Sequence, residues 1–170
     1  MRIGYFGNLG NKRYCVDLIR SLQKFNFNLT IFGRLDDKHK SVCGASYLGV
    51  ASREECLIYA AQCSFLLIVI RKEENSDYAI PGKVYEYVLL RRPILLYCPS
   101  NAIVKKYLEE IFYPFFHVES ENDASLQDDL VNFNHFVATF NWRLMADKFS
   151  VPVRETEFAK FENLFSAKSE

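Results

Sequence analysis

The segment IPGKVYEY at residues 80–87, with the segment RPILLY that follows at residues 92–97, carries the clearest structural signal in this chain of 170 residues. The first segment predicts a loop and then a helix opened by Pro81, because proline fits a first helical turn where its missing N–H costs nothing. The second segment predicts a buried strand by its apolar run. A helix that leads into a buried strand is one unit of an alternating α/β fold.

Short apolar runs and helical patterns alternate along the rest of the chain, which predicts a Rossmann-like α/β domain with a parallel sheet flanked by helices. The expected strands are residues 2–6, 28–32, 45–48, 65–70, 94–98 and 115–118. The expected helices are residues 13–25, 53–62, 81–90, 101–111 and 155–165, with one or two more within 122–149. Ser52 and Glu55 form a capping-box pattern at the second of these helices. Residues 34–40 and 71–79 are expected to be surface loops.

The composition argues against several classes of protein. Lys and Arg number 21 and so do Asp and Glu, so no strongly basic character indicates nucleic acid as a partner. The longest apolar run, residues 65–70, is far shorter than the ~20 residues of a membrane span. The five cysteines form no CxxC pair, which argues against a metal site or a disulfide framework and suits a reducing compartment. Without a signal-peptide pattern before the first strand, the expected location is cytoplasmic.

The start of the helix at Pro81 predicts an anion-binding site. First-turn amides have no intrahelical partner, and Gly82 allows a ligand to approach the backbone closely. Lys83 adds a positive charge at the same place, and Glu86 brings a carboxylate that can accept hydrogen bonds from paired sugar hydroxyls. This combination suits a nucleotide-sugar. The plainer alternative is that Lys83 and Glu86 are solvated side chains forming a weak i, i+3 ion pair.

The same segment resembles the donor-binding segment of retaining glycosyltransferases with the GT-B fold, of the group 1 or family 4 type that includes many bacterial polysaccharide and O-antigen transferases. The pattern there is roughly Pro-x-Lys-x-x-Glu-Tyr and, a few residues later, Pro-Ile-Leu. Residues 3–9, 29–33 and 47–55 resemble, in the same order, further elements of that family's C-terminal domain. The resemblance therefore covers about residues 2–118 and implies one half-domain of a GT-B enzyme.

The resemblance implies that the donor substrate is a nucleoside diphosphate-sugar, with Glu86 on the ribose hydroxyls, Lys83 on a phosphate, and neither metal nor other cofactor. It implies hexosyl transfer to a glycan or lipid-linked acceptor in polysaccharide biosynthesis. In that family an N-terminal domain binds the acceptor, and here a separate domain or subunit would have to do so. Residues 151–170 are expected to form a C-terminal helix that packs on that half, beyond a Rossmann-like domain of residues 1–150. This chain alone is expected to be inactive, and to reach the inner membrane only peripherally, through the missing half.

The loop after the first strand, residues 7–13, is the second candidate ligand loop. In the resembled family a basic residue follows the glycine that corresponds to Gly7, and a lysine follows a few residues later, both on the diphosphate. Asn8 occupies the first place here, and Lys12 or Arg13 could fill the second. The alternative is a helix-start loop with ordinary solvated charges. Gly33 and Arg34, after the second strand, could also line this rim.

Two other features depart from the family or lie outside its motifs. The family often has a second glutamate eight positions before the ribose glutamate, and here that position is Tyr78. The acidic residues nearby that could substitute for it are Glu73, Glu74 and Asp77. The histidines show no metal-ligand spacing and are expected to be structural: His39, His117 and His135.

Two rival functions belong to other classes of protein. A receiver-like signalling domain needs an acidic cluster after the first strand and a phosphoacceptor aspartate after the third, and the sequence has neither. The second rival, a non-catalytic α/β module that binds a nucleotide or a protein partner, remains an alternative. The many aromatic residues of the last third, Phe112 and Phe133 among them, are expected to pack in the core, with a partner-facing surface as the alternative.

Overall fold

The computed structural model describes residues 1–9, 15–43, 46–71, 80–119 and 125–140. The chain divides into two compact units, Met1–Ala138 and Thr139–Glu170. The sheet and the helices that cover it belong to the first unit. The expected helix at residues 155–165, and with it the expected segment 151–170, lies outside the described residues.

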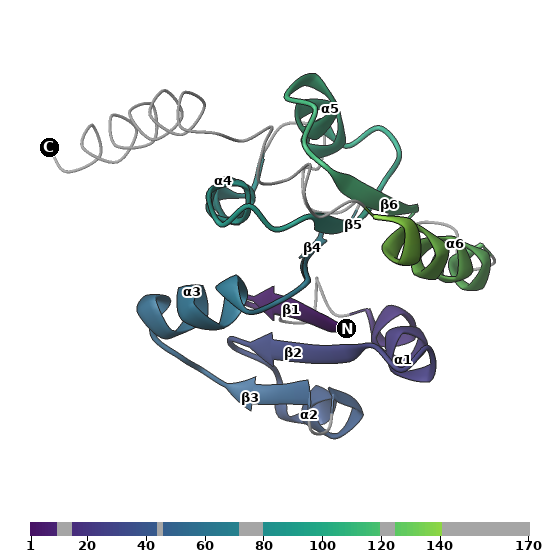
Figure 1. The fold of residues 1–170 in the computed structure, drawn as a ribbon. Coiled ribbons are helices and arrows are strands. Elements are labelled where there is room, and N and C mark those ends of the chain that lie inside the picture. Colours follow the sequence, from purple (N-terminus) through teal and green to yellow (C-terminus); the bar gives the residue numbers. More distant parts are fainter. Residues whose placement is uncertain (10–14, 44–45, 72–79, 120–124, 141–170) are drawn as a thin grey trace, which may run out of the picture. The chain divides into compact units, whose positions relative to one another are not determined.

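Six parallel strands form one sheet in the order β3-β2-β1-β4-β5-β6 (Figure 1). The strands are β1 Arg2–Phe6, β2 Asn28–Phe32, β3 Tyr47–Gly49, β4 Phe65–Val69, β5 Ile94–Cys98 and β6 Phe115–Glu119. Every residue of β4 and β5 is buried, as expected of central strands covered on both faces. The predicted Rossmann-like α/β fold is confirmed.

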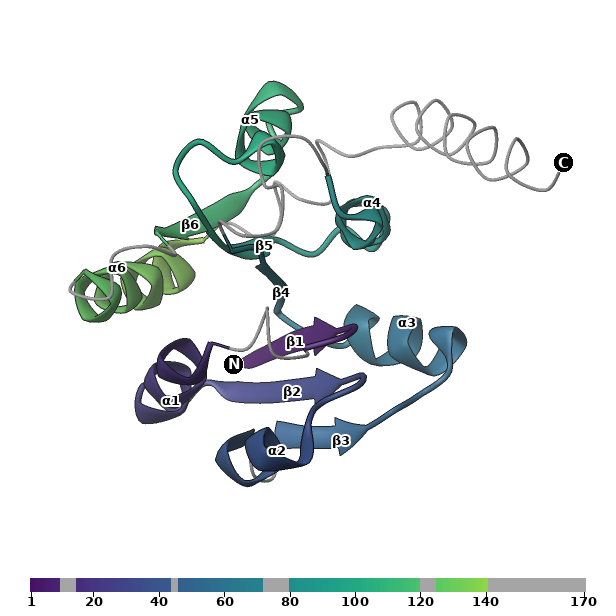
Figure 2. The same ribbon diagram turned by 180° about the vertical axis from the view of Figure 1, so that it is seen from behind.

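The helices are α1 Val16–Lys24, α2 Asp37–Cys43, α3 Arg53–Ala61, α4 Gly82–Leu89, α5 Ile103–Glu110 and α6 Leu126–Thr139. Figures 1 and 2 show α1, α2 and α6 on one face of the sheet and α3, α4 and α5 on the other. The predicted capping box is present at α3: the Ser52 side chain accepts from the Glu55 N–H, and the Glu55 carboxylate accepts from the Ser52 N–H. The helix that begins after Pro81 starts one residue later than predicted, with Pro81 as its N-cap.

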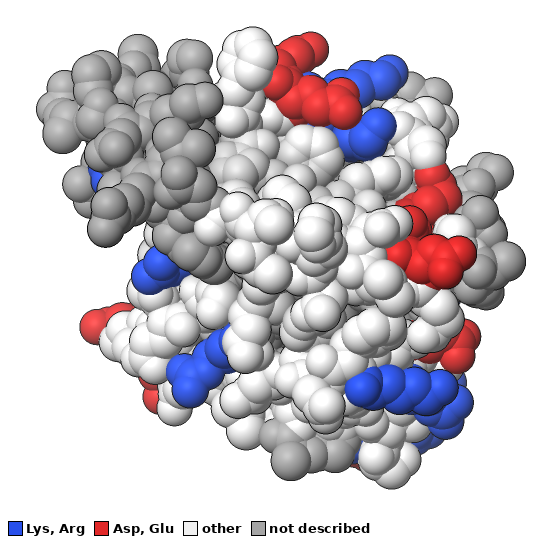
Figure 3. Space-filling model, turned by 45° about the vertical axis from the view of Figure 1, so that its right-hand side comes forward, with Lys and Arg blue, Asp and Glu red and all other residues white. Residues whose placement is uncertain are grey.

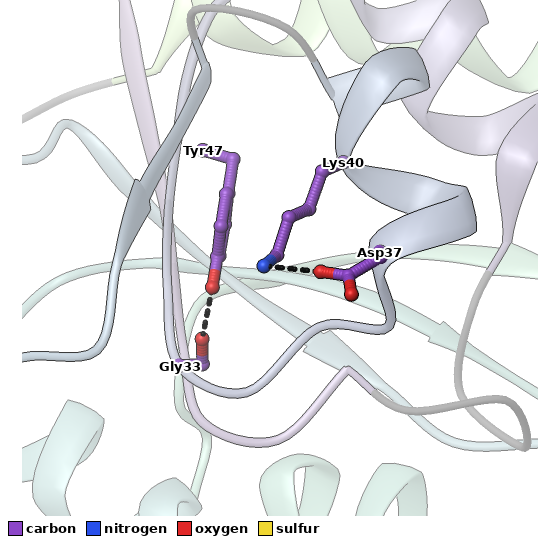
Figure 4. Close-up of polar contacts among 4 residues, drawn as sticks. All are labelled: Gly33, Asp37, Lys40 and Tyr47. Carbon is purple, nitrogen blue, oxygen red and sulfur yellow. Dashed lines mark hydrogen bonds and ion pairs between the residues drawn. The ribbon is translucent and has the colours of Figure 1, made fainter.

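The prediction of a surface loop over residues 34–40 is wrong in its second half, because α2 begins at Asp37. The sequence there is polar, so it shows no apolar period. The helix carries a local ion pair between Asp37 and Lys40 at 2.6 Å and buries Cys43 at its last turn. Figure 4 shows this pair beside Tyr47 of β3, whose hydroxyl donates to the Gly33 carbonyl at 3.1 Å.

An aromatic cluster joins α6 to the sheet. The ring of Phe133 lies 5.3 Å from that of Phe27, 5.1 Å from that of Phe65 and 5.2 Å from that of Phe116, measured between centroids. Phe133 is fully buried, so the prediction of a core role is confirmed for this residue. For Phe112 it is wrong, because 84% of that residue is exposed.

Three helices end in the same way, with a non-glycine residue at positive φ: Asn26 after α1, Arg91 after α4 and Phe112 after α5. At the last of these turns the N–H of Phe112 donates to the Glu109 carbonyl and that of Tyr113 to the Leu108 carbonyl. This is the Schellman pattern, in which glycine is the usual residue at the left-handed position. Asparagine tolerates that conformation, whereas arginine and phenylalanine adopt it at a cost.

Candidate functional site

The candidate site lies where the strand order reverses. The chain proceeds from β1 towards β3 on one side and from β4 towards β6 on the other, so the carboxyl ends of β1 and β4 flank the switch point where ligands bind in such sheets. The ladder between these two strands has only two pairs, Ile3 with Phe65 and Gly4 with Leu66. By contrast, the β4–β5 ladder has four. The carboxyl ends of β1 and β4 are therefore not joined by ladder hydrogen bonds.

A tyrosine from α4 fills this opening. The Phe6 N–H, beyond the end of the β1–β4 ladder, donates to the Tyr87 hydroxyl at 3.3 Å. Tyr87 is 1% exposed, and burial raises the pKa of its hydroxyl well above the ordinary value, so it is neutral near pH 7. Near the carboxyl end of α4, the Tyr113 hydroxyl shares its proton between two carbonyls, that of Arg92 at 2.8 Å and that of Tyr87 at 3.2 Å. These two hydroxyls thus fix the carboxyl-terminal half of α4.

Lys83 reaches from α4 to the residues at the end of β1. Its Nζ atom is buried and lies 4.1 Å from the centroid of the Tyr5 ring, a cation–π contact. The same atom is 3.5 Å from the place that a Cβ would take at Gly7. The Tyr5 hydroxyl donates to the Asn8 carbonyl at 2.9 Å, which shapes the backbone of that loop. The structure thus brings together Lys83, Gly7 and Asn8 from two separate candidate segments.

The loops after β1 and β2 are also in direct contact. The N–H of Gly7 donates to the Phe32 carbonyl at 2.8 Å, and the N–H of Leu9 donates to the Arg34 carbonyl at 3.0 Å. A Cβ placed on Gly33 would lie 1.8 Å from the Gly7 carbonyl oxygen, and the φ of Gly33 is +139°. Only glycine allows the two backbones to come this close. The side chain of Arg34 is exposed and contributes only its backbone to this contact.

The start of α4 is accessible beside the switch point. Pro81 is the N-cap, and its carbonyl accepts from the Val84 N–H at 2.9 Å. A Cβ placed on Gly82 would have no described atom within 4 Å. The backbone at Gly82 is therefore open on that side, as far as the described residues define it.

Glu86 does not pair with Lys83. Its Oε1 accepts from Arg53 at the start of α3, at 2.9 Å from Nη2 and 3.1 Å from Nε. The side chain of Glu86 is 27% exposed and that of Arg53 68%. Arg53 was not identified from the sequence. The one available signal was a basic residue in the first turn of a helix, where positive charge opposes the helix dipole.

The carboxylate of Glu86 also lies close enough to Cys56 of α3 to affect it. Burial raises the pKa of the Cys56 thiol, and the negative charges of Glu55 and Glu86 raise it further. The thiol is therefore mostly protonated near neutral pH and is a weak nucleophile. All five cysteines of the chain lie within the described residues, and none of them forms a disulfide there.

Several sequence candidates lie outside the described residues: Lys12, Arg13, Glu73, Glu74, Asp77 and Tyr78. Of the histidines, His117 contacts the Cys98 carbonyl through Nε2 at 3.0 Å. Within the described ranges, no three His, Cys, Asp or Glu side chains are grouped so that they could hold a metal ion. No helix in those ranges is long and apolar enough to cross a membrane. The part of the molecule that Figure 3 draws in white, blue and red is mostly uncharged, and its charged side chains form small groups, some of which hold both signs.

No known family model matches this chain, and a search of the curated proteins gives no match to its sequence. The class of the protein therefore rests on the fold, a Rossmann-like α/β sheet with six parallel strands. This fold hosts many unrelated activities, so the residues at the switch point have to carry any statement about function.

Proposed function

We propose that this chain is the nucleotide-sugar-binding domain of a GT-B-type glycosyltransferase. The observation that carries the proposal is the position of Lys83 at the switch point, 4.1 Å from the Tyr5 ring centroid and 3.5 Å from the Cβ position of Gly7. A positive charge is thereby held beside two glycine-containing loops whose backbones a ligand can approach. Anionic ligands are the class that such an arrangement favours.

The proposed ligand has two recognition elements with different chemistry. The diphosphate would be bound by Lys83 and by backbone amides at Gly82 and near Gly7 and Asn8, as a charge-assisted interaction. The ribose hydroxyls would donate to the carboxylate of Glu86, which lies one helical turn from Lys83 on α4. Neither element requires a metal ion. The fold supports binding of phosphate and ribose by separate side chains, since Lys83 and Glu86 both belong to α4, which lies at the switch point.

Sugar transfer itself is proposed to need a second, acceptor-binding domain or subunit. Positioning donor and acceptor together supplies much of the rate of a two-substrate reaction, and closure around the donor excludes water. The acceptor class proposed from the resemblance is a glycan or a lipid-linked glycan. This domain then contributes donor binding and no general acid or base that we identify.

Calorimetric titration with uridine and guanosine, and with their diphosphates, tests the proposal. Wild type should bind at least one diphosphate more tightly than its nucleoside. Lys83→Met keeps an apolar stem of similar length and should reduce that advantage about tenfold, the scale of one charge-assisted hydrogen bond. Because the effect is electrostatic, it should shrink at high salt.

The control is Lys106→Met, which removes an exposed lysine from α5. That variant should bind like wild type. A folded wild-type chain that binds none of these diphosphates, or a Lys83→Met variant that loses nucleoside and diphosphate equally, contradicts the proposal.

One observation favours a second candidate, a non-catalytic module that binds a protein partner. Leu48 and Val50, at the edge strand β3, are 52% and 72% exposed, and Ile58 of α3 is 54% exposed. Exposed apolar side chains at a sheet edge are typical of association surfaces. The same titration separates the candidates, since the module needs no nucleotide.

A further inference from the structure

The ion pair between Arg53 and Glu86 involves only one of the two carboxylate oxygens of Glu86. Nε and Nη2 of Arg53 both donate to the same oxygen, Oε1, at 3.1 Å and 2.9 Å. Each carboxylate oxygen has about two lone-pair sites for accepting hydrogen bonds. Arg53 therefore saturates Oε1 and does not occupy Oε2, whose two sites suit two adjacent hydroxyl groups.

The position of Arg53 is itself well fixed at the backbone. It is the first residue of α3, directly after the N-cap Ser52. The capping box closes this turn: the Ser52 N–H donates to Glu55 Oε2 at 2.8 Å, and the Glu55 N–H donates to the Ser52 hydroxyl at 3.2 Å. The capped start of α3 thus holds one partner of the pair, and α4, which Tyr87 joins to the end of β1, holds the other.

The chemistry of arginine matters for this contact. Its guanidinium group is planar and presents neighbouring donors in a fixed geometry, so two bonds to one oxygen orient the carboxylate as well as neutralise it. Lysine offers only a point charge. Since 68% of the Arg53 side chain is exposed, the pair adds little to folding stability. A contribution to ligand geometry is therefore separable from a contribution to folding.

We propose that Arg53 is a positioning residue that holds Oε1 of Glu86 and so presents Oε2 to the vicinal hydroxyls of a ribonucleotide. This inference rests on the proposed function of the site. The Arg53–Glu86 pair would bind the ribose diol of the ligand, and not the phosphates or the base. Two other roles are possible for an arginine here: direct contact with a phosphate, or a simple link between α3 and α4.

The test compares uridine and guanosine diphosphates with their 2′,3′-dideoxy counterparts, by calorimetric titration of the full chain. Wild type should prefer the ribonucleotide. Arg53→Ala should reduce that preference about fivefold while the dideoxy affinity stays within about twofold, because only hydroxyl recognition is disturbed. Arg53→Lys should restore little of it. In a Glu86→Gln background, Arg53→Ala should have no further effect, which is the sign of two residues acting as one unit.

Arg20→Ala, at an exposed arginine of α1 on the other face of the sheet, is the matched control and should bind like wild type. An unchanged ribose preference in Arg53→Ala shows a structural link only and overturns the inference. An equal loss for ribo- and dideoxynucleotides shows a phosphate contact and also overturns it. If wild type binds neither kind of nucleotide, the proposed function has failed, and the inference fails with it.

Discussion

The Tyr87 hydroxyl accepts a hydrogen bond from the backbone N–H of Phe6, at 3.3 Å and across 81 positions of sequence. The β1–β4 ladder has already ended at Gly4 and Leu66, so a side chain takes over from the backbone as the partner of β1. Because Tyr87 and Lys83 lie one turn apart on α4, this bond also sets where Lys83 meets the end of β1. Support of the sheet and placement of the candidate ligand residue are therefore coupled.

Tyr87→Phe should destabilise the protein by about 1–2 kcal/mol, because it leaves the buried N–H of Phe6 without its acceptor. Urea unfolding measures the difference. Tyr59→Phe is the control, since Tyr59 is 40% exposed and the change should stay within about 0.5 kcal/mol of wild type. Equal stability of wild type and Tyr87→Phe would mean that water replaces the hydroxyl.

Stability should fall in mild alkali because of two buried thiols. Burial raises the pKa of Cys63 from 9.0 to about 11 and that of Cys98 from 9.0 to about 12. A raised folded-state pKa means that the folded protein holds the proton more tightly. The stabilisation is therefore complete below about pH 9 and is lost as the pH rises towards 11–12.

Urea unfolding at several pH values between about 8 and 9.5, below the ordinary tyrosine pKa of 10.0, measures this slope. Each thiol should contribute up to about 1.4 kcal/mol per pH unit once its unfolded form is ionised. Cys63→Ala and Cys98→Ala should each flatten the curve, whatever their effect on absolute stability. A wild-type curve that is flat over this range contradicts the prediction.

Alkylation of Cys56 reports the local charge of Glu86. The carboxylates of Glu55 and Glu86 add to the effect of burial in raising the pKa of this thiol. Glu86→Gln removes one of these charges, so the thiolate fraction should rise and iodoacetamide should react modestly faster near pH 8. Glu109→Gln on α5 should leave the rate unchanged. A rate that falls in Glu86→Gln would place the carboxylate away from Cys56.

Substitution by alanine should lower the stability of the protein at Gly33 and leave it nearly unchanged at Gly82. Gly33→Ala should destabilise the protein by on the order of 3 kcal/mol, because a Cβ would lie 1.8 Å from the Gly7 oxygen at a φ of +139°. Gly82→Ala meets no described atom within 4 Å and should fold with nearly wild-type stability. If Gly82 lines the phosphate site, that second variant should still lose diphosphate affinity. Thermal unfolding and calorimetry separate the two effects.

The strands were predictable because their signal is local. Each is a short apolar run, and β1, β2 and β5 have the predicted bounds. The start of α3 was equally local, since Ser52 and Glu55 are three positions apart. The segment of α2 was missed because a short polar helix whose one buried residue is Cys43 shows no apolar period.

The contacts of the candidate site were less predictable because they are distant in sequence. The motif identified Lys83 and Glu86 as ligand contacts, and the plainer alternative paired them with each other. In the fold, Lys83 turns towards Tyr5 and Glu86 towards Arg53, 33 positions earlier in the chain. No local pattern specifies which of several charged side chains will face a given carboxylate. That choice is set by the packing of α3 beside α4.

The two-pair ladder between β1 and β4 affects how the sheet would respond to force. It divides the sheet into two groups of three strands, β3-β2-β1 and β4-β5-β6, and the chain crosses between these groups once, through α3. Side-chain packing also spans this seam, including that of Phe133 on Phe27 and Phe65. A load applied across the sheet would have only two backbone pairs to break here, as at the irregular β2–β3 edge. For the same reason, a cut between α3 and β4 would yield two fragments, each with complete internal ladders, that are suited to reassembly in trans.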